Sequence, residues 1–189
     1  MPQDLRQIQW TEYGQTVLHP LSLLILVIMV VVLLQSRRVY ILIPFLVVGA
    51  FLTHMQRLVI GSFDFSMLRL LLIAGVGRAL IRNDVRRIDW RGMDSAFLAY
   101  VIIASVSYVM LWQNTTAITN RLGFAFEALL AFFLIRVYVS STAQVKVLVR
   151  AFALVFAVVA IFMFIERYTR YNFFSIFGGV PALTRMREG

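Results

Sequence analysis

The sequence predicts an all-α membrane protein, and three observations lead to this fold class. Hydrophobic residues make up 61% of the 189-residue chain and the mean hydropathy is +0.84, whereas soluble domains contain about 45–50% apolar residues. The apolar residues gather in six long runs separated by short polar segments. The run 23–34 lacks the alternation of apolar and polar residues that a membrane barrel strand requires. Since only helices and closed barrels satisfy their backbone hydrogen bonds in lipid, the runs are predicted to be transmembrane helices.

The lengths of the runs predict about six membrane crossings. A spanning helix needs roughly 20 mostly apolar residues, within a range of about 17–25. Five runs reach this length, and the second reaches it only if its helix continues through Arg57 to Val59. The predicted spans are Leu18–Leu34, Val39–Thr53, Phe65–Ile81, Ser95–Trp112, Leu122–Val139 and Val145–Ile165.

The first run is preceded by residues 1–17, which we interpret as an interfacial segment. This segment contains Asp4 and Glu12, and it has neither the basic start nor the small-residue cleavage site of a secretory signal. The first helix is therefore expected to be a retained anchor. Pro20 stands at its start, where a proline is tolerated.

Glycines in the second and third helices are predicted to be points of close helix packing. Gly49 lies in the second helix, and Gly75 and Gly77 lie in the third. Small residues let helix backbones approach each other closely in membranes. Pro44 is predicted to lie inside the second helix.

The distribution of Lys and Arg predicts the orientation of the chain. The first, third and fifth connections with their flanks hold ten basic residues, whereas the N-terminal segment and the second and fourth connections hold three. Basic residues concentrate in cytoplasmic connections, so both chain ends are predicted to face the outer side. Residues 18–165 then form one membrane domain, and residues 166–189 form an outer-side tail. The four arginines of that tail suggest an anionic ligand.

Two charged residues within the predicted fifth helix need an explanation. Glu127 lies near its outer end, where an ionised carboxylate is unfavourable and usually faces the bundle interior. It is either a base or substrate contact, or the structural partner of an arginine on a neighbouring helix. Arg136 lies nine residues further along, on the opposite face of the helix, so it is expected to extend to the cytoplasmic surface.

Arg69 lies near the outer end of the third helix. With Arg57 and His54 it could form a cationic pocket for a phosphate or a carboxylate. It could equally form a local pair with Asp64 while contacting lipid headgroups. The mixed-sign segment Arg78–Asp94 is predicted to be a cytoplasmic connection that contacts anionic lipid.

Composition excludes several kinds of site. The chain has no cysteine, which excludes disulfides, thiolate metal sites and a cysteine nucleophile. His19 and His54 lie on different segments, and no spacing of His, Asp and Glu resembles a metal site, so no metal and no cofactor are expected. The net charge of +9 is explained by arginines at helix ends. Membrane lipids, and not nucleic acid, are therefore the expected partners.

The end of the sixth helix carries a recognisable pattern: Glu166, Thr169, Tyr171, Asn172, Phe173 and Phe174. Together with the arginine-rich spacer between the third and fourth helices, it resembles the bacterial O-antigen ligase/polymerase family. Arg170 is a departure, since a glycine is usual there. The resemblance implies a multi-pass enzyme of the bacterial inner membrane. Such enzymes transfer glycans from a polyprenyl diphosphate carrier on the outer face.

The resemblance covers residues 65–189 and implies that the chain is the N-terminal half of a longer protein. The large outer loop with the essential residues of the family lies in the second half, so the resemblance assigns no catalytic residue here. Arg185 and Arg187 are predicted to touch the diphosphate, from their position and charge.

Two other classes of protein stay open. The chain could be a non-catalytic membrane subunit that packs in a larger complex, which would suit its length and its aromatic-rich helices. It could also be a transporter fragment, for which Pro44 would be the residue that interrupts a helix.

Overall fold

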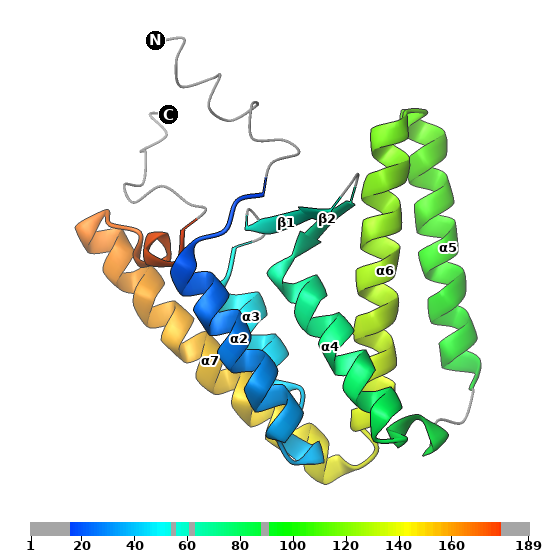
Figure 1. The fold of residues 1–189 in the computed structure, drawn as a ribbon, viewed down its shortest axis with the longest axis horizontal. Coiled ribbons are helices and arrows are strands. Elements are labelled where there is room, and N and C mark those ends of the chain that lie inside the picture. The colour runs from blue at the N-terminus through cyan, green and yellow to red at the C-terminus, as the bar shows by residue number, and fades with distance from the viewer. Residues whose placement is uncertain (1–15, 54–55, 61–62, 88–90, 179–189) are drawn as a thin grey trace.

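A computed structural model of the chain describes residues 16–53, 56–60, 63–87 and 91–178. Across these residues the fold is mostly helical, with six α-helices, a two-stranded sheet and three short 3-10 helices (Figure 1). The α-helices are α2 (Pro20–Gln35), α3 (Ile43–Phe51), α4 (Met67–Ile81), α5 (Gly92–Trp112), α6 (Thr115–Tyr138) and α7 (Thr142–Thr169). The strands are β1 (Arg57–Ile60) and β2 (Phe63–Ser66), and the 3-10 helices are η1 (Arg38–Tyr40), η2 (Asp84–Arg87) and η3 (Phe173–Phe177).

Three helical stretches are long and apolar enough to cross a membrane: Gly92–Trp112, Ala117–Tyr138 and Thr142–Thr169. Few of their side chains are buried within the molecule, and large apolar residues such as Leu111 and Leu154 are mostly exposed. Such a surface would be unfavourable in water, whereas it matches the hydrocarbon of a bilayer. The chain is thus a helical membrane protein, and the number of six crossings stays a prediction.

The second apolar run forms a shorter helix than predicted. It begins with η1 and continues as α3, which ends at Phe51. The continuation to Val59 that a span of full length would require does not form, because Arg57–Ile60 is extended and forms β1. Pro44 is also not an interior proline: it stands in the first turn of α3, where its missing N–H is tolerated. The helix interruption that the transporter alternative requires is therefore not at Pro44.

Strands β1 and β2 form an antiparallel hairpin at one end of the helices (Figure 1). Arg57 pairs with Ser66 and Leu58 with Phe65. Val17 and Arg57 exchange two backbone hydrogen bonds of 3.1 Å. This hairpin, which was not predicted, pairs backbone groups between α3 and α4 that an irregular segment near lipid would leave without partners.

The buried core lies between α2, α3, α4 and α6. Leu33, Ile41, Leu71 and Tyr138 are almost completely buried in it. Helix α7 packs on α3, and α5 packs chiefly on α6. Figure 1 accordingly shows the α5–α6 pair at one side of the molecule and α7 at the other.

Successive connections alternate between the two ends of the molecule (Figure 1). The connections after α2, α4 and α6 lie at one end. The hairpin, the connection after α5 and the described ends of the chain lie at the other, which we call the hairpin end. This is the alternation that repeated crossings produce, while the outer location of both termini stays a prediction.

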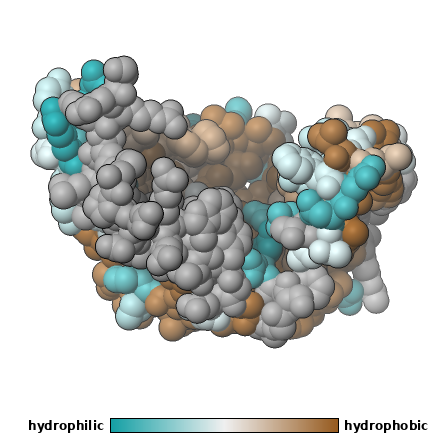
Figure 2. All heavy atoms as spheres, turned by 90° about the horizontal axis from the view of Figure 1, so that it is seen from above, coloured by the Kyte–Doolittle hydropathy of each residue, from teal (hydrophilic) through white to brown (hydrophobic). Residues whose placement is uncertain are grey.

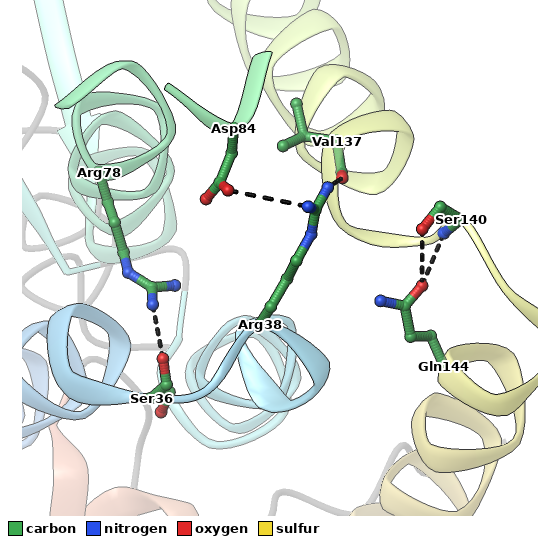
Figure 3. Close-up of polar contacts among 7 residues, drawn as sticks. All are labelled: Ser36, Arg38, Arg78, Asp84, Val137, Ser140 and Gln144. Carbon is green, nitrogen blue, oxygen red and sulfur yellow. Dashed lines mark hydrogen bonds and ion pairs between the residues drawn. The ribbon is translucent and has the colours of Figure 1, made fainter. Parts of the chain in front are cut away.

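Arginines close a helix terminus at the end opposite the hairpin end. Arg78 Nη2 donates to the Ser36 carbonyl (2.5 Å; Figure 3), and Arg82 Nη2 donates to the Leu34 carbonyl (3.1 Å). The last carbonyls of a helix lack partners within it and carry partial negative charge, so these two guanidinium groups stabilise the end of α2. Arg78 is only 3% exposed, and it therefore does not make the headgroup contact predicted for its segment.

Arg38 closes the end of α6 in the same way. Its Nη2 donates to the Val137 carbonyl (2.6 Å), and its Nη1 lies 3.8 Å from Asp84 Oδ1. Figure 3 shows the Arg38 side chain extending toward both partners. Through these contacts the ends of α2, α4 and α6 are joined to one another.

The segment that follows α7 is held against α2 and α3 at the hairpin end. Ser22 Oγ donates to the Phe177 carbonyl (2.5 Å), and Thr53 Oγ1 donates to the Gly178 carbonyl (3.2 Å). The side-chain amide of Gln56, which is 0% exposed, donates to both carbonyls. The first part of the predicted outer-side tail thus packs on the membrane domain.

Gly75 allows a close approach of α4 to its neighbours. A Cβ on this residue would stand 2.7 Å from Phe45 Cζ and 3.0 Å from Leu134 Cδ1. At Gly49 and Gly77 a Cβ would meet no described atom within 4 Å. The predicted packing role of these two glycines is therefore wrong.

We expect G75A to destabilise the protein, since Phe45 and Leu134 would have to shift in a packed core. Overpacking of this kind typically costs about 1–3 kcal/mol. The matched control is G77A, which should leave stability unchanged or raise it by up to about 1 kcal/mol, because alanine is the better helix former. Thermal unfolding in detergent measures both, and equal unfolding temperatures for the two variants would contradict the packing assigned to Gly75.

Candidate functional site

A polar chamber of about 200 Å³ opens between the hairpin and the beginnings of α4 and α6. Three of its wall residues, Arg57, Asp64 and Ser66, come from the hairpin, and Arg69 comes from the first turn of α4. The remaining wall is the start of α6, which contributes Thr119, Asn120 and Gly123. The chamber therefore combines two guanidinium groups with hydroxyl, amide and carboxylate groups.

The start of α4 fixes the position of Arg69. Ser66 caps the helix, and its Oγ accepts a hydrogen bond from the Arg69 backbone N–H (3.2 Å). The guanidinium then bridges two elements: Nη1 donates to the Asp64 carbonyl (2.5 Å), and Nε donates to Glu127 Oε2 (3.2 Å) on α6. Arg69 thus connects the hairpin to α6.

Glu127 lies on α6 and forms an ion pair with Arg69. The two side chains are 24% and 22% exposed. A carboxylate within a membrane helix is favourable only with such a partner. Two roles were left open for Glu127. The structure shows the contact that the second role requires, the pairing with an arginine on a neighbouring helix.

Asp64 has a different partner from the one expected. Its carboxylate lies 3.4 Å from Arg57 Nη1 within the hairpin, and Arg69 contacts only its main-chain carbonyl. The Asp64 side chain is 41% exposed, so this pair is loosely held and contributes little to stability. His54, which was expected to join the cationic pocket, lies outside the described residues.

An apolar groove begins where the chamber ends. A cavity of about 570 Å³ extends along α3, α4 and α6, and a further cavity of about 130 Å³ continues it toward Leu148 of α7. Arg69 and Asn120 line both the chamber and the groove. The groove is otherwise lined mainly by apolar side chains, among them Phe45, Leu46, Leu68, Leu72, Phe124, Ala128 and Ala131.

Chamber and groove together can accommodate an amphiphile. Guanidinium groups bind phosphate through two parallel hydrogen bonds, and the apolar groove offers a hydrocarbon chain a place next to that head. Figure 2 looks onto the hairpin end and shows hydrophilic residues there next to strongly hydrophobic ones. The arrangement of a charged head site beside an apolar channel is the chemical character of a lipid-binding site.

Several residues of this site were absent from the sequence prediction. Thr119, Asn120 and Gly123 lie on α6, whose start is seven residues earlier than the predicted Leu122. A signal for them existed, because Asn120, Gly123 and Glu127 are spaced by three and four residues and so lie on one helix face. Arg185 and Arg187, the predicted diphosphate contacts, lie outside the described residues.

A further ion pair lies away from the chamber and joins α5 to α6. Arg136 Nε lies 2.7 Å from Asp94 Oδ1, and its Nη2 donates to Asp94 Oδ2 (3.0 Å). Asp94 also caps α5 by accepting from the Arg91 backbone N–H (2.7 Å). The Arg136 guanidinium thus holds the two helices together at their ends, while its extension to the cytoplasmic surface stays a prediction.

Among the described residues no group of three or more His, Asp or Glu side chains is placed to hold a metal ion. Comparisons of the chain with protein-family models, with curated proteins and with solved structures found no match.

We expect the Arg69–Glu127 pair to contribute measurably to stability. In a double-mutant cycle of R69M and E127Q, the coupling should be about 1–2 kcal/mol, since each single change leaves the other charge without its partner. The matched control is a cycle of R57M and D64N, whose longer and more exposed pair should couple by less than about 1 kcal/mol. Additive effects of R69M and E127Q would show that the contact is not an energetic pair.

Proposed function

We propose that this protein is a membrane glycan transferase, or the N-terminal half of one. It would act on a saccharide carried by a polyprenyl diphosphate on the outer face of the bacterial inner membrane. In this proposal the chain crosses the membrane six times, and the hairpin end faces outward. The observation that carries the proposal is that Arg69 and Asn120 are shared by the polar chamber and the apolar groove. A polyprenyl diphosphate needs such an arrangement, with a polar site for the diphosphate directly beside an apolar site for the hydrocarbon chain.

The sequence pattern after the sixth helix and the alternation of connections add support. Glu166 ends the apolar part of α7, and Asn172 caps η3 by accepting from the Phe174 backbone N–H (2.9 Å). These residues belong to the pattern that resembles the O-antigen ligase/polymerase family. Helices of 16 and 15 residues, such as α2 and α4, are about 22–24 Å long, and a bilayer can adapt to such short spans by thinning.

The transfer reaction gives each charged group of the chamber a role. The acceptor hydroxyl oxygen would attack the anomeric carbon while the bond from that carbon to the diphosphate oxygen breaks. The diphosphate leaves with the electron pair, and the guanidinium groups of Arg57 and Arg69 would stabilise its charge. Arg185 and Arg187 would add to this stabilisation from the tail.

Asp64 is the carboxylate best placed to accept the acceptor proton. Its side chain lines the chamber, and its ionic contact among the described residues is the loose one with Arg57. A diphosphate that takes over Arg57 would release the Asp64 carboxylate to face the acceptor hydroxyl. Glu127 suits this role less, since its partner Arg69 holds it within α6.

We expect R69Q to weaken binding of a polyprenyl diphosphate by about tenfold or more, since a charge-assisted hydrogen bond contributes about 1.5–3 kcal/mol. Binding of the corresponding polyprenol should change little, because its contacts lie in the groove. The measurement is a titration of the full-length protein in neutral-lipid nanodiscs. The R185A/R187A variant in the same titration tests the tail.

The matched control for R69Q is R121Q. Arg121 lies on the first turns of α6, near the chamber, but its guanidinium stacks on the Tyr108 ring at 3.8 Å and lines neither the chamber nor the groove. The variant should therefore bind the diphosphate like the wild type. Equal affinities of the wild type for the diphosphate and the polyprenol would refute the proposed function.

A second candidate function is that of a non-catalytic membrane subunit. It is favoured by α5, which packs chiefly on α6 and exposes large apolar side chains along its length, including Met93, Tyr100, Ile103 and Met110. This candidate predicts a stoichiometric partner that co-purifies after extraction in mild detergent, detected by native mass measurement. A single species with the mass of this chain's own full-length protein would exclude it.

A further inference from the structure

We propose that Gly123 is a positioning residue, which sets the head-group preference of the site by letting Arg69 lie flat against α6. This inference rests on the proposed function, because it concerns the same chamber. Gly123 has no side chain, and this absence determines where the Arg69 guanidinium can bind an anion.

The contact between Gly123 and Arg69 is unusually close. A Cβ on Gly123 would stand 2.8 Å from Arg69 Nη2 and 3.1 Å from both Cζ and Nη1. Real Cβ atoms essentially never come within 3.0 Å of a heavy atom outside their own residue and its neighbours in the chain. Any side chain at this position would therefore displace the guanidinium from its present place.

That place is defined by contacts on several sides. Nε of Arg69 donates to Glu127, Nη1 donates to the Asp64 carbonyl, and Nη2 lies against Gly123. Gly123 and Glu127 are four residues apart and so lie on one face of α6. The guanidinium thus lies across this face, at the boundary that Arg69 and Asn120 form between the chamber and the groove.

A larger residue at position 123 should move Arg69 without disrupting the helix. The atoms that a new Cβ would meet are the far end of a flexible side chain, which can rotate away. Alanine is moreover a better helix former than glycine. Gly75 is the contrasting case, because a Cβ there meets Phe45 and Leu134 in the packed core.

The displaced guanidinium would lose the orientation that favours a diphosphate. Two parallel hydrogen bonds to a phosphate require a fixed guanidinium plane, and G123A removes the flat surface that fixes it. We therefore expect G123A to weaken binding of a polyprenyl diphosphate by about tenfold, with a change of less than about twofold for the corresponding polyprenol. A merely structural effect would weaken both ligands alike.

The test is a double-mutant cycle of G123A and R69Q in full-length protein, read by titration with the diphosphate and the polyprenol. In the R69Q background, G123A should cause no further loss of diphosphate binding, since the group that it displaces is gone. The matched control is G77A, where a Cβ meets no described atom within 4 Å, and its binding should equal that of the wild type.

The outcomes separate the two proposals. If R69Q binds the diphosphate like the wild type, the proposed function fails. If R69Q weakens binding while G123A does not, or if the two losses multiply in the double variant, the role of Gly123 is overturned. Should G123A fail to fold, recovery of folding in G123A/R69Q would support the steric link to Arg69, and persistent failure would overturn it.

Discussion

The fold depends on satisfying backbone groups where helices end, because lipid offers them no partner. At the end opposite the hairpin, side chains from other elements supply these partners: Arg78 reaches the Ser36 carbonyl and Arg38 reaches the Val137 carbonyl. At the hairpin end, strand pairing and side-chain donors such as Gln56 do the same. Few side chains of the three long apolar stretches are buried within the molecule, so these polar contacts add to the core between α2, α3, α4 and α6 in holding the helices together.

Charged side chains near lipid need partners as well, and this explains why the candidate site carries as many acidic as basic groups. Arg57 and Arg69 each have a carboxylate nearby, from Asp64 and Glu127 respectively. The tighter pair ties α4 to α6, and the looser pair lies in the more exposed hairpin. An anion that binds Arg57 would thus replace Asp64 as its partner at little cost in stability. The Arg69–Glu127 pair meanwhile keeps the chamber next to the groove. The site is charge-balanced before any ligand arrives.

Hydropathy predicted the membrane class and the approximate places of the helices, because a long apolar run is enough to indicate burial in lipid. It could not predict where the helices end, because single residues determine the position of each helix end. The hairpin had a local signal in Gly61–Ser62 between two short runs rich in aromatic and β-branched residues, which the surrounding hydrophobicity obscured.

The candidate site was predicted only in part. Arg69 and Glu127 were identified as charges in need of partners, but their pairing joins residues 58 positions apart in the sequence. The spacing of Asn120, Gly123 and Glu127 indicated a shared helix face, but the close contact of Gly123 with Arg69 became visible only in the structure.

The contacts around Phe177 also fix an order of assembly. Ser22 lies on α2, and its acceptor follows 155 residues later in the chain. Thr53 and Gln56 likewise lack their acceptors at Phe177 and Gly178 until α7 has been inserted. The hairpin end is therefore completed only after the chain has been made through Gly178, because the early polar side chains find their acceptors there.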